Sequence, residues 1–138
     1  MRVLVCGGRD FDDLPLLGDA LERVHARHVI TLLIHGGARR ALDTAAHHWA
    51  GFKRVPVQVF HDDWGQFGSG AGPIRNSKML AEGKPELVLA FPGGRGTANM
   101  VEQARSAGVS VCEVSRTADW WAEAIKAGRS DYEQLHRT

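Results

Sequence analysis

The stretch Leu87-Val88-Leu89-Ala90-Phe91-Pro92-Gly93-Gly94-Arg95-Gly96-Thr97 joins an apolar run of strand length to a glycine-rich turn. An apolar run without polar alternation is typical of a strand buried on both faces of a parallel sheet. Pro92 has no N–H to donate and therefore ends the strand, and the glycines after it let the backbone approach a ligand closely. A helix beginning at or just before Thr97 would direct free N–H groups and a partial positive charge into the turn. The stretch therefore predicts an anion site, with phosphate as the expected anion.

Strand and helix patterns alternate along the chain on both sides of this stretch. Strands are predicted at residues 3–6, 29–34, 55–60, 87–91 and 109–114, and helices at 14–28, 42–51, 74–81, 97–107 and 119–127. Asp12 or Asp13 is expected to cap the first helix, and Pro56 places its strand at an edge of the sheet. We therefore predict a single α/β domain over residues 1–138, with a Rossmann-like, doubly wound, mostly parallel sheet of about five strands flanked by helices. Residues 129–138 are expected to fray.

Glycine turns follow three of the predicted strands. They lie at residues 7–8, 36–37 and 93–96, and arginines accompany all three: Arg9 at the first, Arg39 or Arg40 at the second, and Arg95 at the third. In doubly wound sheets, ligands bind outside the carboxyl ends of the strands. The three turns are therefore expected to share one rim and to form a common anion pocket.

Composition and charge limit the classes of function. A net charge of +1 provides no basic field, so nucleic-acid binding is not favoured. Cys6 and Cys112 lie in apolar runs and are expected to be buried thiols, not a disulfide. His25 and His28 are suitably spaced on a helix but lack a third metal ligand, so we predict no metal ion and no cofactor. The apolar run before Gly7 is too short for a signal peptide or a membrane span, which favours a cytoplasmic protein.

Two common nucleotide motifs are absent from the glycine turns. No Gly-Lys-Ser/Thr triplet closes any of them, which excludes a Walker A loop. The dinucleotide fingerprint is incomplete as well, because Asn99 occupies the position where the third glycine would follow Gly94 and Gly96. Neither motif therefore accounts for the predicted phosphate site.

Four motifs occur in order along residues 1–115. They are Cys6-Gly7-Gly8-Arg9-Asp10-Phe11, His35-Gly36-Gly37-Ala38-Arg39, Asp63-Trp64 with Ala71-Gly72-Pro73-Ile74-Arg75-Asn76, and Pro92-Gly93-Gly94-Arg95-Gly96-Thr97. The last resembles the Pro-Gly-Gly-x-Gly-Thr phosphate loop of the Lonely-guy phosphoribohydrolases, which belong to the SLOG superfamily together with the DNA-processing protein DprA. As a set, the motifs are closer to the short YspA-related members of that superfamily. The resemblance implies a Rossmann-like fold, a nucleotide or nucleotide-derived ligand, and a homodimer.

The chain departs from this pattern at two positions. Met100 stands where the Lonely-guy enzymes carry a catalytic glutamate, whereas Arg75 matches their catalytic arginine. Short members have Gly-Ala-Asp after Ala-Arg, but here Arg40 replaces the glycine and Asp43 follows one residue later. From the residues alone, Asp10 on the rim is the best remaining carboxylate to stabilise an oxocarbenium ion or activate water, and Asp43 is the second. We therefore predict Arg75 and Asp10 as the catalytic candidates.

The predicted ligand-binding residues come from all four motifs. They are Gly7, Gly8, Arg9, Gly36, Gly37, Ala38, Arg39, Asp43, Trp64, Asn76, Pro92, Gly93, Gly94, Arg95, Gly96 and Thr97. Trp64 either stacks on a base or anchors its loop. Asn76 has the donors and the acceptor to bond a ribose hydroxyl or a base edge. Asp10 is alternatively a helix cap or a partner for Arg9, and His35 is expected to be a structural histidine.

Three hypotheses of function remain. In the first, the protein hydrolyses the base–ribose bond of a nucleoside 5′-monophosphate. In the second, it is a non-catalytic module that senses or sequesters a nucleotide-derived signal, as Met100 in place of glutamate indicates. A DprA-like nucleic-acid handler is the third, and the near-neutral charge disfavours it.

Overall fold

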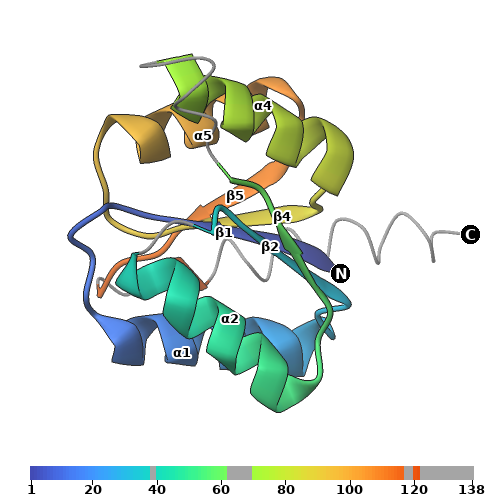
Figure 1. Cartoon of the computed structure of the whole chain (residues 1–138). Helices are drawn as coiled ribbons and strands as arrows, with labels where there is room; N and C mark the ends of the chain where they lie inside the picture. The colour runs from blue at the N-terminus through green and yellow to red at the C-terminus, as the bar shows by residue number, and fades with distance from the viewer. Residues whose placement is uncertain (38–39, 62–69, 117–119, 122–138) are drawn as a thin grey trace, which may run out of the picture.

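The computed structural model describes residues 1–37, 40–61, 70–116 and 120–121. Five parallel strands form one sheet in the order β3-β2-β1-β4-β5. The elements are β1 (Arg2–Cys6), α1 (Leu14–Arg27), β2 (Leu32–His35), α2 (Ala41–Lys53), β3 (Val57–Val59), α4 (Ala71–Gly83), β4 (Leu87–Ala90), α5 (Arg95–Ser106) and β5 (Ser110–Glu113). Helices α1 and α2 cover one face of the sheet, and α4 and α5 cover the other (Figure 1). The predicted Rossmann-like, doubly wound fold is confirmed, and the described part of the sheet is wholly parallel.

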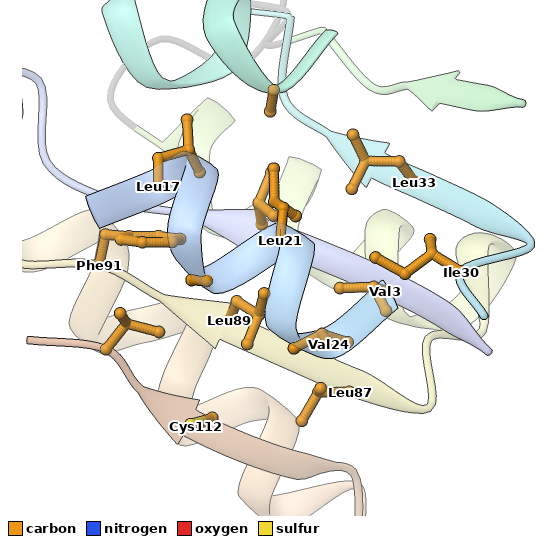
Figure 2. Packing of buried hydrophobic residues seen from close by; sticks show 14 of the residues in the cluster. Val3, Leu17, Leu21, Val24, Ile30, Leu33, Leu87, Leu89, Phe91 and Cys112 are labelled. Carbon is orange, nitrogen blue, oxygen red and sulfur yellow. The ribbon is translucent and has the colours of Figure 1, made fainter. Parts of the chain in front are cut away.

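The central strands are buried on both faces, as their unbroken apolar sequences predict. On one face, Val3 of β1 and Leu89 of β4 pack under Leu17 and Leu21 of α1 (Figure 2). On the other face, Leu4, Ile34 and Val88 pack against Met79 of α4 and Met100 of α5. Because successive residues of a strand point to opposite faces, one short strand supplies both cores.

Local signals set several element boundaries. Asp13, and not Asp12, caps α1 by accepting a hydrogen bond of 3.3 Å from the N–H of Leu16, and Pro15 lies in the first turn. Strand β3 pairs only with β2 and lies at the edge of the described sheet, as Pro56 predicts. Both cysteines are free thiols, as expected; Cys112 is buried as predicted, whereas Cys6 is half-buried.

Other boundaries differ from the predicted ones. Helix α4 begins at Ala71 and not at residue 74, because Pro73 is tolerated within the first helical turn, where its missing N–H would have no partner in any case. Strand β2 begins at Leu32, three residues later than predicted. The predicted helix 119–127 lies largely outside the described residues, as does the tail 129–138. Trp120 and Trp121 are described, and Trp120 is buried in the core under α1.

The strand order places a switch point beside the central strand. From β1 the chain winds outward to β2 and β3, and then returns to add β4 and β5 on the opposite side of β1. The loops after β1 and β4 therefore lead to helices on opposite faces and leave a crevice between them, which is where doubly wound sheets bind ligands. Among the described helices, none has the length and apolar character needed to cross a membrane.

Candidate functional site

A cavity of about 630 Å³ opens at this switch point, outside the carboxyl ends of β1 and β4. Its walls are the loop after β1 and the turn that leads from β4 into α5, and its lining is Gly7, Gly8, Arg9, Asp10, Phe11, Asp12, Arg40, Pro92, Gly93, Gly94, Arg95, Gly96 and Thr97. We call it the outer cavity. Its volume is in the range that suits a ligand the size of a nucleotide.

The two loops that form the outer cavity are in backbone contact. The N–H of Gly8 donates a hydrogen bond of 2.9 Å to the carbonyl oxygen of Pro92. A Cβ added to Gly8 would lie 2.7 Å from the Cα of Gly93, and one added to Gly93 would lie 2.8 Å from the Cα of Gly8. Both glycines are therefore required for this close approach, whereas a Cβ on Gly94 or Gly96 would point into open space.

Helix α5 begins at the wall of the outer cavity. Gly94 is its N-cap and supplies no side chain, and the first helical hydrogen bond runs from the N–H of Ala98 to the carbonyl of Gly94 over 3.0 Å. The N–H groups of residues 95–97 precede this bond and lie at the positive end of the helix dipole. The turn therefore has the geometry of an anion site, as its sequence predicts.

Three arginines and two aspartates line the outer cavity: Arg9, Arg40 and Arg95, with Asp10 and Asp12. Arg9, Asp10 and Arg95 are exposed at the rim. Arg40 is half-buried, and its Nη1 donates a hydrogen bond of 3.3 Å to the carbonyl of Gly7. Arg40, one of the two arginines expected at the second turn, therefore lines the outer cavity, whereas Ala38 and Arg39 lie outside the described residues.

A much smaller cavity of about 20 Å³, the inner chamber, adjoins the outer cavity. Both are lined by Gly7, Arg40, Gly96 and Thr97, and the inner chamber adds Val5, Cys6, Gly36, Asp43, Arg75, Asn76 and Met79. A Cβ on Gly36 would collide with the guanidinium of Arg75 and would lie 3.7 Å from Oδ2 of Asp43. Glycine at this position therefore lets the two charged groups meet the end of β2.

Cys6 lies beside these charges, and its thiol is held in the protonated form. Burial, with the carboxylate of Asp43 as a smaller contribution, raises the pKa of the Cys6 thiol to about 12, although the guanidinium of Arg75 acts in the opposite sense. The thiol therefore stays protonated at neutral pH, whereas nucleophilic cysteines need the thiolate. Both charged groups therefore lie close to the same sulfur atom.

The side chain of Asn76 forms hydrogen bonds within the protein. Its Nδ2 donates hydrogen bonds to the carbonyl of Gly96, over 3.2 Å, and to Oδ1 of Asn99, over 3.1 Å, and its Oδ1 accepts one from Nε of Arg75. Its side chain is buried, and these contacts join α4 to the first turn of α5. In this structure the amide therefore orients Arg75 and the glycine turn, whereas the sequence suggested a contact with ribose or base.

The second glycine turn is divided between two cavities. Gly36 reaches the inner chamber, but Gly37, at a positive φ of 64°, borders a separate hollow beside His35 and His47. The N–H of Gly37 donates to Nδ1 of His35 over 3.0 Å, so the proton of the neutral imidazole lies on Nε2, which is 3.0 Å from Nδ1 of His47. His35 is thus the structural histidine that was expected.

Protonation of His35 is expected to destabilise the fold. Burial, followed by the nearby His47 and His61, lowers the pKa of His35 from 6.5 to about 4. Between pH 6.5 and pH 4, His35 is protonated in the unfolded chain but neutral in the folded chain. The contribution of neutral His35 to the stability of the fold is therefore complete above pH 6.5 and is lost as the pH falls towards 4. We expect this residue to account for about 3 kcal/mol of the unfolding free energy over that range.

Urea denaturation at pH 7 and pH 4 measures this effect. The matched variant is His35→Asn, because an amide oxygen can accept the Gly37 hydrogen bond without titrating. The difference in unfolding free energy between the two pH values should be smaller by about 3 kcal/mol in the variant. An unchanged difference would assign the acid sensitivity to other groups.

The remaining residues predicted for the site lie in different environments. Asp10 is exposed at the rim, Asp43 is buried at 5% exposure in the inner chamber, and Trp64 lies outside the described residues. Met100 is buried in the core between β4 and α4 and lines neither cavity. Sequence reasoning did not select Asp12 or Cys6 as site residues, although Cys6 directly precedes the first glycine turn and Asp12 follows it by four residues.

Taken together, the doubly wound parallel sheet and the glycine-lined cavity at its switch point define a Rossmann-like domain. Residues 1–67 match the family described as YAcAr, the YspA, cpYpsA-related SLOG family. This match covers just under half of the chain and supports its resemblance to the SLOG superfamily and to the YspA-related branch. The matched residues contain β1 to β3 and the first two glycine turns. No curated protein and no solved structure matches the chain.

Proposed function

We propose that the protein binds a nucleoside 5′-monophosphate, or a related nucleotide-derived ligand, in the outer cavity. The observation that carries the proposal is the N-terminus of α5 opening onto a cavity of about 630 Å³ at the switch point. The phosphate would accept hydrogen bonds from the N–H groups of residues 95–97, and the nucleoside would occupy the rest of the outer cavity.

The charges of the outer cavity support an anionic ligand. Three arginines against two aspartates give its lining a net positive charge, and guanidinium groups bind phosphate oxygens in pairs. Arg40 is the best placed of the three, because its hydrogen bond to Gly7 holds it at the boundary between the two cavities. Arg9 and Arg95 are exposed and can reorient towards a ligand.

Hydrolysis of the base–ribose bond is the second candidate function. Asp43 and Arg75, a carboxylate and a cation gathered in the inner chamber, favour it. The burial of Met100 in the core favours binding without turnover, because the carboxylate of the Lonely-guy enzymes is missing from α5. A homodimer and a cytoplasmic location also remain proposals.

Isothermal titration calorimetry with the four common nucleoside 5′-monophosphates tests the main proposal. At least one of them should bind, and the corresponding nucleoside without phosphate should bind at least about tenfold more weakly, because the helix terminus then has no anion to hold. Equal affinity for nucleotide and nucleoside would remove the phosphate site. Retention on single-stranded DNA that falls steeply with salt would instead support nucleic-acid handling.

A further inference from the structure

Helices α4 and α5 lie side by side on one face of the sheet (Figure 1), and four polar side chains join them. Oγ of Ser77 donates a hydrogen bond of 2.7 Å to Oε1 of Gln103, whose Nε2 donates one of 2.7 Å to Oδ1 of Asn99. The same Oδ1 accepts a bond of 3.1 Å from Nδ2 of Asn76, which also donates to the carbonyl of Gly96 over 3.2 Å. We call these four side chains the polar relay. It leads from a surface groove between the two helices to the glycine turn at the start of α5.

The orientation of the amides in the polar relay is fixed by their partners. Gln103 also donates from Nε2 to the carbonyl of Pro73, over 3.2 Å. Asn76 uses both hydrogens of Nδ2 in the two bonds given above, and its Oδ1 accepts from Nε of Arg75 over 3.2 Å. Reversing the Asn76 amide alone would place its oxygen against two other oxygens. The relay therefore has one arrangement in which its donors meet acceptors.

The inner end of the polar relay holds one peptide unit of the glycine turn. The carbonyl of Gly96 and the N–H of Thr97 belong to the same rigid plane and point in opposite directions. A hydrogen bond to this carbonyl therefore fixes the direction of the N–H, and it polarises the unit so that the N–H becomes a stronger donor. Thr97 lines the outer cavity, and its N–H precedes the first helical hydrogen bond of α5, which is donated by Ala98.

We propose that Asn99 and Gln103 are positioning residues for the anion bound at this turn. By holding Asn76, they keep the peptide unit of Gly96 and Thr97 in the orientation that directs its N–H towards the phosphate. The inference rests on the proposed function, since it requires a phosphate at the N-terminus of α5. Asn99 and Gln103 line neither the outer cavity nor the inner chamber, so they act through the backbone and not by touching the ligand.

The packing of α4 and α5 rests on other residues. Met79, Met100 and Ala104 form the buried contact of the two helices with the sheet. Two hydrogen bonds of Gln103 lie at the exposed groove, where water competes for the same groups and leaves little net stability. What these bonds supply is orientation. Glycine at position 99, as in the dinucleotide fingerprint, would interrupt the polar relay because it has no side-chain oxygen.

The first test compares the wild type with Asn99→Leu, which keeps the branched shape and favours a helix but cannot accept the two hydrogen bonds. Affinities for the four common nucleoside 5′-monophosphates and for their nucleosides are measured by isothermal titration calorimetry. Without its acceptor, Asn76 can turn away from Gly96. We therefore expect the nucleotide to bind about tenfold more weakly, while the affinity for the nucleoside stays within about twofold of the wild-type value. A purely structural role would leave the ratio of the two affinities unchanged.

A double-mutant cycle tests the connection between the two positioning residues. Gln103→Met keeps the length of the side chain and removes the outer support, so the affinity for the nucleotide should fall about fivefold. Because both substitutions interrupt the same relay, the double variant should lose no more than about twofold beyond Asn99→Leu, whereas independent effects would multiply to about fiftyfold. Glu102→Gln, at an exposed position of α5 outside the relay and both cavities, is the control and should stay within about twofold of the wild type.

The outcomes separate this inference from the proposed function. If the wild type binds a nucleotide and both single variants keep its ratio of affinities, the positioning role is wrong and the phosphate site stands. Losses that multiply in the double variant overturn the relay as well. If the wild type binds no nucleotide, the proposed function falls and the positioning role falls with it. Circular dichroism checks that each variant is folded, and Gln103→Met, at a half-buried position, decides the matter if Asn99→Leu does not fold.

Discussion

Replacing Gly94 with aspartate should lower the affinity for a nucleoside 5′-monophosphate by about 100-fold, equivalent to roughly 2.7 kcal/mol. Gly94 is the N-cap of α5 at the wall of the outer cavity, so the new carboxylate would lie where the phosphate is expected. Two unit charges about 4 Å apart near a protein surface repel by about 4 kcal/mol, and solvent at the open cavity reduces this figure. The repulsion is therefore large enough to account for the expected loss.

The fold should tolerate this substitution. A Cβ on Gly94 meets no atom within 4 Å, and aspartate and asparagine are both preferred at helix N-caps. The melting temperature of Gly94→Asp should therefore equal or exceed that of the wild type while its affinity falls. Gly94→Asn is the matched control, because it adds the same shape without the charge and should retain most of the affinity. Equal affinities for the two variants would place the phosphate elsewhere.

Replacing the neighbouring Gly93 with alanine should destabilise the fold by about 3 kcal/mol, at the upper end of the cost of overpacking. Its Cβ would lie 2.5 Å from the backbone nitrogen and 2.8 Å from the Cα of Gly8, and it would collide with Oγ1 of Thr97. Backbone atoms cannot rotate away, so the two loops must separate and lengthen the hydrogen bond from Gly8 to Pro92.

Urea denaturation of Gly93→Ala beside Gly94→Ala measures this cost. The two substitutions are chemically identical and adjacent, but only the new Cβ at position 93 meets neighbouring atoms. The unfolding free energy of Gly94→Ala should therefore stay within about 0.5 kcal/mol of the wild-type value. Similar stabilities for the two variants would show that the loops after β1 and β4 do not approach as closely as the structure has them.

The sequence predicted the strands, the helix cap and the edge strand because each of these features depends on residues that are neighbours in the chain. The run before Pro92 is apolar at each position, which indicates a strand buried on both faces, and β4 has that environment. A side-chain oxygen three residues before a backbone N–H is sufficient to cap a helix, and Asp13 does so. The edge position of β3 follows from Pro56, which cannot donate to a neighbouring strand.

The roles of individual polar residues depended on contacts between distant segments. Asn76 has the sequence properties of a ligand-binding amide, but its partners Gly96 and Asn99 are 20 or more residues away and meet it only because α4 packs on α5. The burial of Asp10 and Asp43 depended on such packing as well. Both carboxylates follow a glycine turn, and only the packed structure shows which of them is buried.

By itself, the sequence determined an α/β fold of alternating strands and helices, and a glycine turn with the backbone freedom to receive an anion. Hydrophobic periodicity and the special backbones of glycine and proline are properties of neighbouring residues, so they can be recognised without a structure. Only the tertiary structure decided which loops meet at the switch point, that Arg40 lines both cavities, and that Asp43 and Arg75 share a chamber the size of a water molecule. Burial and proximity are created when the layers pack, and no spacing along the chain encodes them directly.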